Sequence, residues 1–166
     1  SEEMIKIAYN KMPNATLYQG DFTNGLVEPL KDRKYDCIIA TYSLHHLDEE
    51  QKVSLIKDLI FLLNEDGKIY IGDIAFQTRD DLESCKKNAG EYWDDEEIYF
   101  VYEELKKKLP KLEFYKHSLC SGVLIISKLA ISGSYPRGGS YLLQIAGNIL
   151  KLFIVMKKAV VWILHK

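Results

Sequence analysis

The sequence predicts an α/β fold with a mostly parallel sheet that ends in an antiparallel hairpin. Residues 37–40 form an unbroken apolar run, and residues 68–76 form a second, largely apolar one, which is typical of strands covered on both faces. A helical pattern over 49–63 lies between them, as a parallel connection requires. Two later strand-like runs, 112–118 and 122–128, are separated by three residues and therefore predict the hairpin.

The first thirty residues predict a helix, a short strand and a turn. Glu2 and Glu3 suit the positive N-terminal end of a helix, and Pro13 closes that helix. Residues 15–18 are predicted as a short strand. Residues 25–30 are predicted as a short helix or a turn.

The helix over 49–63 has the clearest local signals. Asp48 is predicted as its N-cap, with Gln51 three residues later in a capping-box pattern. Gly67 is the expected stop after its C-terminal end.

Two polar helices are expected over 79–88 and 94–109. The acidic run at 94–97 matches the charge expected in the first turn of a helix. We therefore predict no metal site in this sequence.

The three cysteines, Cys37, Cys85 and Cys120, are far apart and form no Cys-x-x-Cys motif. This spacing supports neither a disulfide framework nor a zinc knuckle. A reducing, cytoplasmic setting follows as the expectation.

Charge divides the chain at Glu113. All 24 acidic residues but only 15 of the 22 basic ones lie in 1–113. An acidic folded part predicts no nucleic-acid binding. The sequence divides into a domain at 1–128, a linker at 129–141 and an apolar, basic helical tail at 142–166. We expect the tail to contact a membrane surface or a partner and to be dispensable to the sheet.

Polar and aromatic side chains follow the strand at 37–40, where open α/β sheets bind their ligands. Asp73 ends the next strand along the chain and is expected at the same edge. The residues after the first strand are Thr41, Tyr42, Ser43, His45 and His46. This edge is the candidate active site.

Five short motifs resemble those of class I S-adenosylmethionine-dependent methyltransferases, in the same order and spacing over residues 1–128. They are Ser-Glu-Glu-Met at 1–4, Gly-Asp-Phe at 20–22, Tyr-Asp-Cys-Ile at 35–38, His-His-Leu at 45–47 and Gly-Lys-Ile at 67–69. The resemblance implies a Rossmann-like fold, with S-adenosylmethionine as cofactor and a small-molecule acceptor.

The resemblance also assigns cofactor-binding roles. It implies that Asp21 accepts a hydrogen bond from the adenine amine and that Phe22 brackets the ring, and both side chains suit those roles chemically. Met4 is expected near the adenosine, and Thr41 beside the methionine part of the cofactor.

His45 and Tyr42 are the expected catalytic residues. An imidazole titrates near neutrality, so His45, or its neighbour His46, is a candidate base for an acceptor that must lose a proton. Tyr42 is expected either to contact the sulfonium through a cation–π interaction or to orient an acceptor hydroxyl.

The family's first strand, glycine-rich loop and ribose-binding acid precede the position of Ser1 in the resemblance. We therefore expect this chain, taken alone, to be impaired as a methyltransferase. The alternative is a non-catalytic, degenerate domain of the same fold that is used for partner binding.

Overall fold

The computed structural model describes residues 2–128 and 160–164, in two compact units, Ser1–Arg33 and Lys34–Lys166. The first unit contains α1 (Glu2–Lys11), a 3₁₀ turn η1 (Phe22–Asn24) and α2 (Glu28–Lys31). Residues 15–18, predicted as a strand, are irregular. A strand needs a partner for its backbone groups, and no other segment described in 2–33 is extended into a strand.

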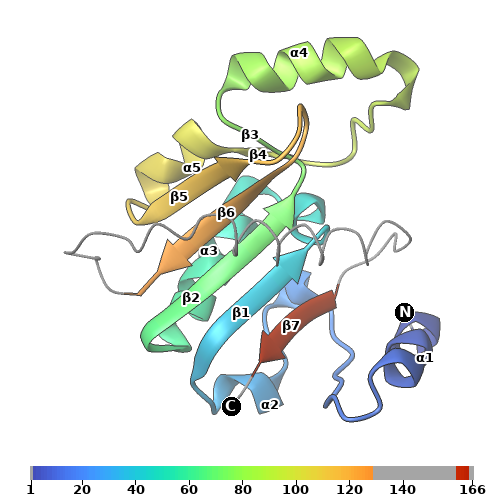
Figure 1. Ribbon diagram of the computed structural model, residues 1–166, viewed down its shortest axis with the longest axis vertical. Helices are drawn as coiled ribbons and strands as arrows, with labels where there is room; N and C mark the ends of the chain where they lie inside the picture. Colours follow the sequence, from blue (N-terminus) through green and yellow to red (C-terminus); the bar gives the residue numbers. More distant parts are fainter. Residues whose placement is uncertain (1, 129–159, 165–166) are drawn as a thin grey trace. The chain divides into compact units, whose positions relative to one another are not determined.

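The second unit is organised around a five-stranded sheet of order β5-β6-β2-β1-β7 (Figure 1). Its strands are β1 (Tyr35–Thr41), β2 (Leu63–Asp73), β5 (Leu112–Lys116), β6 (Gly122–Ser127) and β7 (Val160–Leu164). The α/β class and the β5–β6 hairpin are confirmed. Within the described residues the sheet is mixed rather than mostly parallel, because β1 and β2 are parallel and the other neighbouring pairs antiparallel.

Helix α3 (Glu49–Phe61) makes the crossover from β1 to β2. The capping box of Asp48 and Gln51 is present as predicted. The helix ends before Gly67, which lies inside β2 instead of terminating the helix. A Cβ added at Gly67 would lie 2.8 Å from the carbonyl oxygen of Tyr35, so glycine permits the two strands to approach here.

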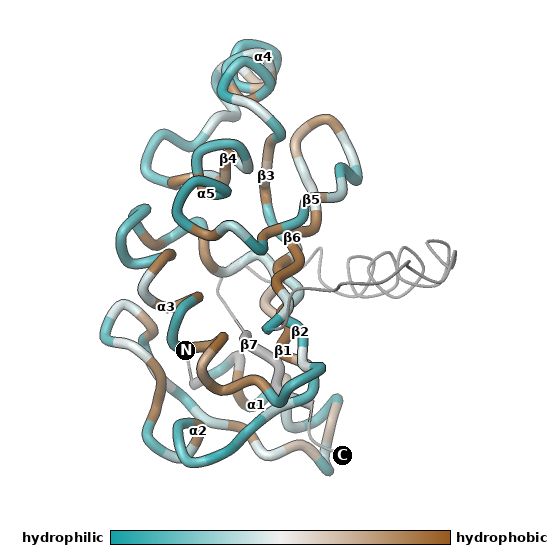
Figure 2. Tube along the Cα trace, turned by 90° about the vertical axis from the view of Figure 1, so that its left-hand side faces the viewer, coloured by the Kyte–Doolittle hydropathy of each residue, from teal (hydrophilic) through white to brown (hydrophobic). Residues whose placement is uncertain are grey.

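The chain beyond the carboxyl end of β2 forms a smaller group of elements (Figure 1). It contains β3 (Ala75–Phe76), α4 (Arg79–Ala89), η3 (Gly90–Tyr92), β4 (Phe100–Val101) and α5 (Tyr102–Lys108). Phe76, Leu82, Cys85 and Val101 form its core. Figure 2 shows hydrophobic residues along β6 and its neighbouring strands, whereas α4 is mostly hydrophilic.

The helix predicted over 94–109 begins only at Tyr102, and residues 94–99 form a loop. The backbone of Ile98 explains the difference. Its N–H donates to the carbonyl of His45 at 2.8 Å, and its carbonyl accepts from the ammonium of Lys52. Both groups are therefore unavailable to a helical ladder.

Lys52 is a buried cation on α3, with 2% of its surface exposed. Its ammonium lies 4.9 Å from the ring centroid of Phe100, in addition to its bond to the carbonyl of Ile98. Burial lowers the pKa of Lys52 to about 8, although the negative charge of Asp73 opposes this shift.

Cys85 and Cys120 form a disulfide with a Cα–Cα distance of 6.1 Å, so the sequence-based prediction of unpaired cysteines is wrong for this pair. The bond joins α4 to the turn between β5 and β6 across 35 residues of sequence, a proximity that only the folded chain creates. Cys37 is free and half-buried. The cytoplasmic setting stays a prediction, but the absence of a disulfide no longer supports it.

The C-terminal strand β7 pairs with β1 from Cys37–Leu164 to Thr41–Val160. The tail predicted as a helix over 142–166 is therefore extended at 160–164. The sequence Val-Val-Trp-Ile-Leu has high strand propensity, and the edge of β1 offers unpaired backbone groups. The linker, the rest of the tail and its membrane or partner contact lie outside the described residues. Among the described helices, none is long and apolar enough to cross a membrane.

Deleting residues 160–166 is expected to destabilise the sheet, in contrast to a dispensable tail. Several ladder hydrogen bonds to β1 would be lost, at roughly 1 kcal/mol each, which lowers the free energy of unfolding by on the order of 3 kcal/mol. Urea unfolding of the chain measures this change. A chain lacking only residues 165 and 166 is the control, and equal stability of all three forms would contradict the contribution of β7.

The stability difference between the wild type and Lys52→Met should depend on pH. The pKa of Lys52 is lowered to about 8 in the folded chain, below the unfolded value near 10.4. Between these values the unfolded chain binds the extra proton, so the wild type gains up to about 3 kcal/mol relative to the variant as pH rises.

Urea unfolding at pH 7 and at pH 10 measures this difference. Lys57→Met, which removes an exposed lysine from the same helix, should show no such dependence. A difference between wild type and Lys52→Met that is constant with pH would contradict the prediction.

Candidate active site

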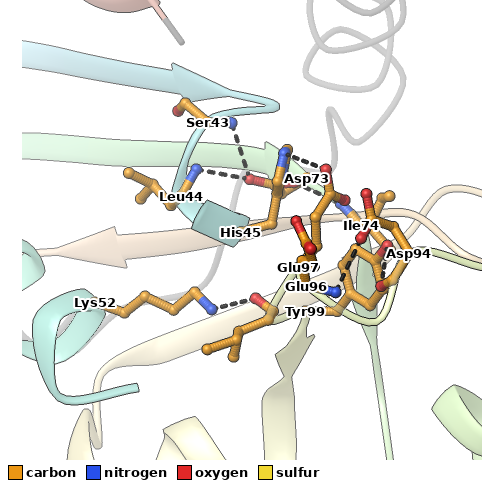
Figure 3. Close-up of polar contacts among 11 residues, drawn as sticks. Ser43, Leu44, His45, Lys52, Asp73, Ile74, Asp94, Glu96, Glu97 and Tyr99 are labelled. Carbon is orange, nitrogen blue, oxygen red and sulfur yellow. Dashed lines mark hydrogen bonds and ion pairs between the residues drawn. The ribbon is translucent and has the colours of Figure 1, made fainter. Parts of the chain in front are cut away.

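The carboxylate of Asp73 organises the carboxyl ends of β1 and β2. It is 1% exposed and accepts four hydrogen bonds (Figure 3). The N–H groups of Ser43 and Leu44 donate to Oδ2 at 3.2 and 3.1 Å, and His45 Nδ1 and the N–H of Ile74 lie 2.6 and 2.9 Å from Oδ1. Four donors fill the acceptor sites of one carboxylate.

The parallel register of β1 and β2 explains why these groups meet. Thr41 lies opposite Gly72, and the N–H of Tyr42 donates to the carbonyl of Gly72 at 2.9 Å. The chain then turns sharply into the 3₁₀ turn η2 (Leu44–His46). Tyr42 has φ 44°, a left-handed conformation that no other non-glycine residue of the described part adopts. Such local strain often occurs at functional sites.

His45 is held in one orientation by this loop. Its side chain is buried, and a hydrogen bond of 2.6 Å from Nδ1 to Asp73 directs Nε2 to the opposite side. Nε2 lies 3.4 Å from a carboxylate oxygen of Glu97. Burial lowers the pKa of His45, but the hydrogen bond and charge of Asp73 outweigh that effect, so the pKa is raised overall.

The loop at 94–99 supplies further polar groups to this edge. Glu97 is fixed beside His45 because the next residue, Ile98, bonds to the carbonyl of His45. The ring of His46 lies 4.2 Å from that of His45, centroid to centroid. Tyr99 packs edge-on against Trp93, and burial together with the carboxylate of Glu97 raises the pKa of its hydroxyl.

Both expected catalytic residues, Tyr42 and His45, lie in the loop after β1. Tyr42 is half-buried, and burial with the charge of Asp73 raises the pKa of its phenol, which keeps it neutral. Thr41 is buried at the end of β1. Asp73 lies at the predicted edge, where it contacts His45 directly.

Asp21, Phe22 and Met4, the expected adenosine-binding residues, belong to the first unit. Asp21 is exposed and caps η1, accepting hydrogen bonds from the N–H and hydroxyl of Thr23 at 3.0 and 2.7 Å. The Thr23 hydroxyl is the main cause of the lowered pKa of Asp21. Phe22 is half-buried in that turn, and Met4 lies in α1.

Sequence reasoning missed Glu97, Lys52 and Tyr99 as members of this edge. The sequence predicts Glu97 as part of a helix start and gives no signal for Lys52 or Tyr99. Glu97 reaches His45, and Ile98 reaches Lys52, only through the long connection from β2 to α5, which no local pattern encodes.

Comparison with known proteins finds methyltransferases, by sequence and by fold. A family model described as a methyltransferase domain matches residues 1–67. An uncharacterized methyltransferase of Oceanobacillus iheyensis is 36% identical over 80 residues, which cover 48% of this chain and 36% of that protein. The chain spans between about a third and about half the length of the curated relatives it matches.

Two solved structures share the fold. An O-methyltransferase family protein from Burkholderia thailandensis matches with a TM-score of 0.55 at 10% identity, over 76% of this chain and 40% of that one. The magnesium protoporphyrin IX methyltransferase of Synechocystis, solved with bound SAH, matches with a TM-score of 0.50 at 18% identity. That match covers 75% of this chain and 57% of the other.

The sequence match to a methyltransferase domain, the curated methyltransferase relatives and the shared α/β fold agree with the motifs around Asp21 and His45. Residues 1–67 thus match a methyltransferase domain, and the chain is similar in sequence to curated methyltransferases and in fold to solved ones.

Proposed function

We propose that the protein containing these residues transfers a methyl group from S-adenosylmethionine to a small-molecule acceptor, with His45 as the general base. The observation that carries this proposal is the buried Asp73–His45 pair at the carboxyl ends of two parallel strands. Ligands of open α/β sheets bind at this edge.

The orientation of His45 suits proton transfer. In the neutral imidazole, Nδ1–H donates to Asp73 and Nε2 carries the free lone pair. The raised pKa of His45 makes that lone pair more basic. Asp73 also stabilises the imidazolium that forms after Nε2 accepts the acceptor's proton. Tyr42, which stays a neutral phenol, is a donor available to orient an acceptor oxygen.

The chemistry of the donor set fits the proposed cofactor. S-adenosylmethionine supplies an electrophilic methyl group on a sulfonium, and the protein's main task is to position it. Asp21 Oδ1 is occupied by Thr23, whereas Oδ2 has one long contact of 3.5 Å from Asn24 and retains acceptor capacity for an adenine amine. Ser43 Oγ is fully buried and has no hydrogen-bond partner among the described residues. We propose that Phe22 and Met4 contact the adenosine, and Thr41 the methionine part.

Replacing His45 by alanine should slow methyl transfer by about 10²- to 10⁴-fold, the usual contribution of a general base. Affinity for S-adenosylmethionine should change little, because Nε2 faces the acceptor in this proposal. Formation of S-adenosylhomocysteine from labelled cofactor, in the presence of a protein-free extract of small molecules, measures the rate.

The matched control is His117→Ala, which removes an exposed histidine from the β5–β6 turn. Transfer by His45→Ala at the wild-type rate would remove His45 from the chemistry. In a parallel assay with whole-cell extract and methyl-labelled cofactor, transfer of label to protein or nucleic acid instead of small molecules would contradict the acceptor class.

Replacing Asp21 by serine should weaken S-adenosylhomocysteine binding measurably, because the adenine amine would lose its carboxylate acceptor. Serine is also a favourable N-cap, so η1 should remain intact. Ligand-observed nuclear magnetic resonance detects affinities into the millimolar range. Asp32→Ser is the control in the same unit, and equal affinity of Asp21→Ser and wild type would remove Asp21 from the site.

A further inference from the structure

We propose that His45, His46 and Glu97 bind a zinc ion at the edge of the sheet. Each residue offers one ligand atom, and these atoms all lie within 4.8 Å of one another. Two imidazole nitrogens and a carboxylate oxygen are a ligand set that zinc uses in proteins, with the fourth position open. The inference does not depend on methyl transfer, but a bound zinc would occupy Nε2 of His45 and so exclude this histidine as the base while the ion is present.

The distance between His45 and Glu97 fits a shared ion. Ligand atoms placed about 2.0–2.1 Å from a tetrahedral zinc are separated from each other by about 3.3–3.4 Å. Nε2 of His45 and Oε1 of Glu97 are 3.4 Å apart. This separation is long for a direct hydrogen bond, whose donor and acceptor lie about 2.7–3.2 Å apart.

His45 already has the support that metal-binding histidines require. Its Nδ1 is bonded to the buried carboxylate of Asp73, which fixes the ring and presents the lone pair of Nε2. A histidine that ligates a metal through one nitrogen commonly donates to a carboxylate through the other. Asp73 accepts three backbone N–H groups besides, so this support does not move when an ion arrives.

The other two ligands are fixed to different degrees. Glu97 is half-buried and held next to His45 by the hydrogen bond of Ile98. His46 is exposed, so its side chain can rotate the short distance that closes the site. With zinc bound, Asp73 and Glu97 supply two negative charges to a dication, while the ammonium of Lys52 opposes it from the α3 side.

A direct ion pair between protonated His45 and Glu97 is the competing explanation for the 3.4 Å separation. His46 distinguishes the two, because an ion pair does not need it and a zinc site does. In the zinc-bound form His45 Nε2 is a ligand, and the cation rather than the imidazole would assist loss of a proton from an acceptor hydroxyl.

Calorimetric titration of the untagged, metal-free chain with zinc chloride near neutral pH tests the site. We expect one zinc per chain, and at least tenfold weaker binding in both His46→Ala and Glu97→Gln. Both variants change groups that are not fully buried, and circular dichroism verifies their fold. His117→Ala and Glu96→Gln are matched controls that should bind as the wild type does.

X-ray absorption of the zinc-loaded chain identifies the ligand atoms. Only nitrogen and oxygen neighbours near 2.0–2.1 Å are expected, whereas a sulfur neighbour near 2.3 Å would assign the ion to Cys37 or another thiol. Absence of stoichiometric binding, or unchanged affinity in either His46→Ala or Glu97→Gln, would overturn the proposal. The titration contains no cofactor, so its failure would leave the proposed methyl transfer standing.

Discussion

The buried carboxylate of Asp73 is the constraint on which the active-site edge depends. A charge with almost no exposure must be compensated, and here one histidine and three backbone N–H groups provide the compensation. Those donors belong to residues 43–45 and 74, so satisfying Asp73 fixes both the loop after β1 and the departure of the chain from β2. Removing one partner of such a group leaves an uncompensated polar atom in the interior.

A second set of hydrogen bonds fixes the position of the loop at 94–99 relative to His45. The carbonyl of His45 accepts from Ile98, and the carbonyl of Ile98 accepts from Lys52. Glu97 therefore has a defined place beside an imidazole, although it lies in a segment without regular structure. An acidic side chain, two imidazoles and a neutral phenol at Tyr99 are thereby gathered at one edge of the sheet.

Sequence patterns anticipated elements whose signals are local. The capping box at Asp48 is complete within four residues, and the β5–β6 hairpin follows from two strand-like runs separated by a short turn. The strand that ends at Thr41 could also be predicted from the sequence, because its continuous apolar run indicates burial on both faces. Local patterns gave wrong predictions where a neighbouring strand determines the conformation. Residues 15–18 do not form a strand, because their unit contains no described strand to pair with. Gly67 does not end a helix but permits the close approach of two strands.

The sequence by itself determined the α/β class, the polar end of β1 with His45 and Tyr42, and Asp73 at the end of the following strand. It did so because parallel strands joined by a helix must bring their carboxyl ends to one edge. Tertiary structure alone decided that Asp73 bonds to His45, that Glu97 faces Nε2, that Cys85 meets Cys120, and that Val160–Leu164 pairs with β1. These contacts join residues 28 or more positions apart, and their free energy exists only after the intervening chain has folded.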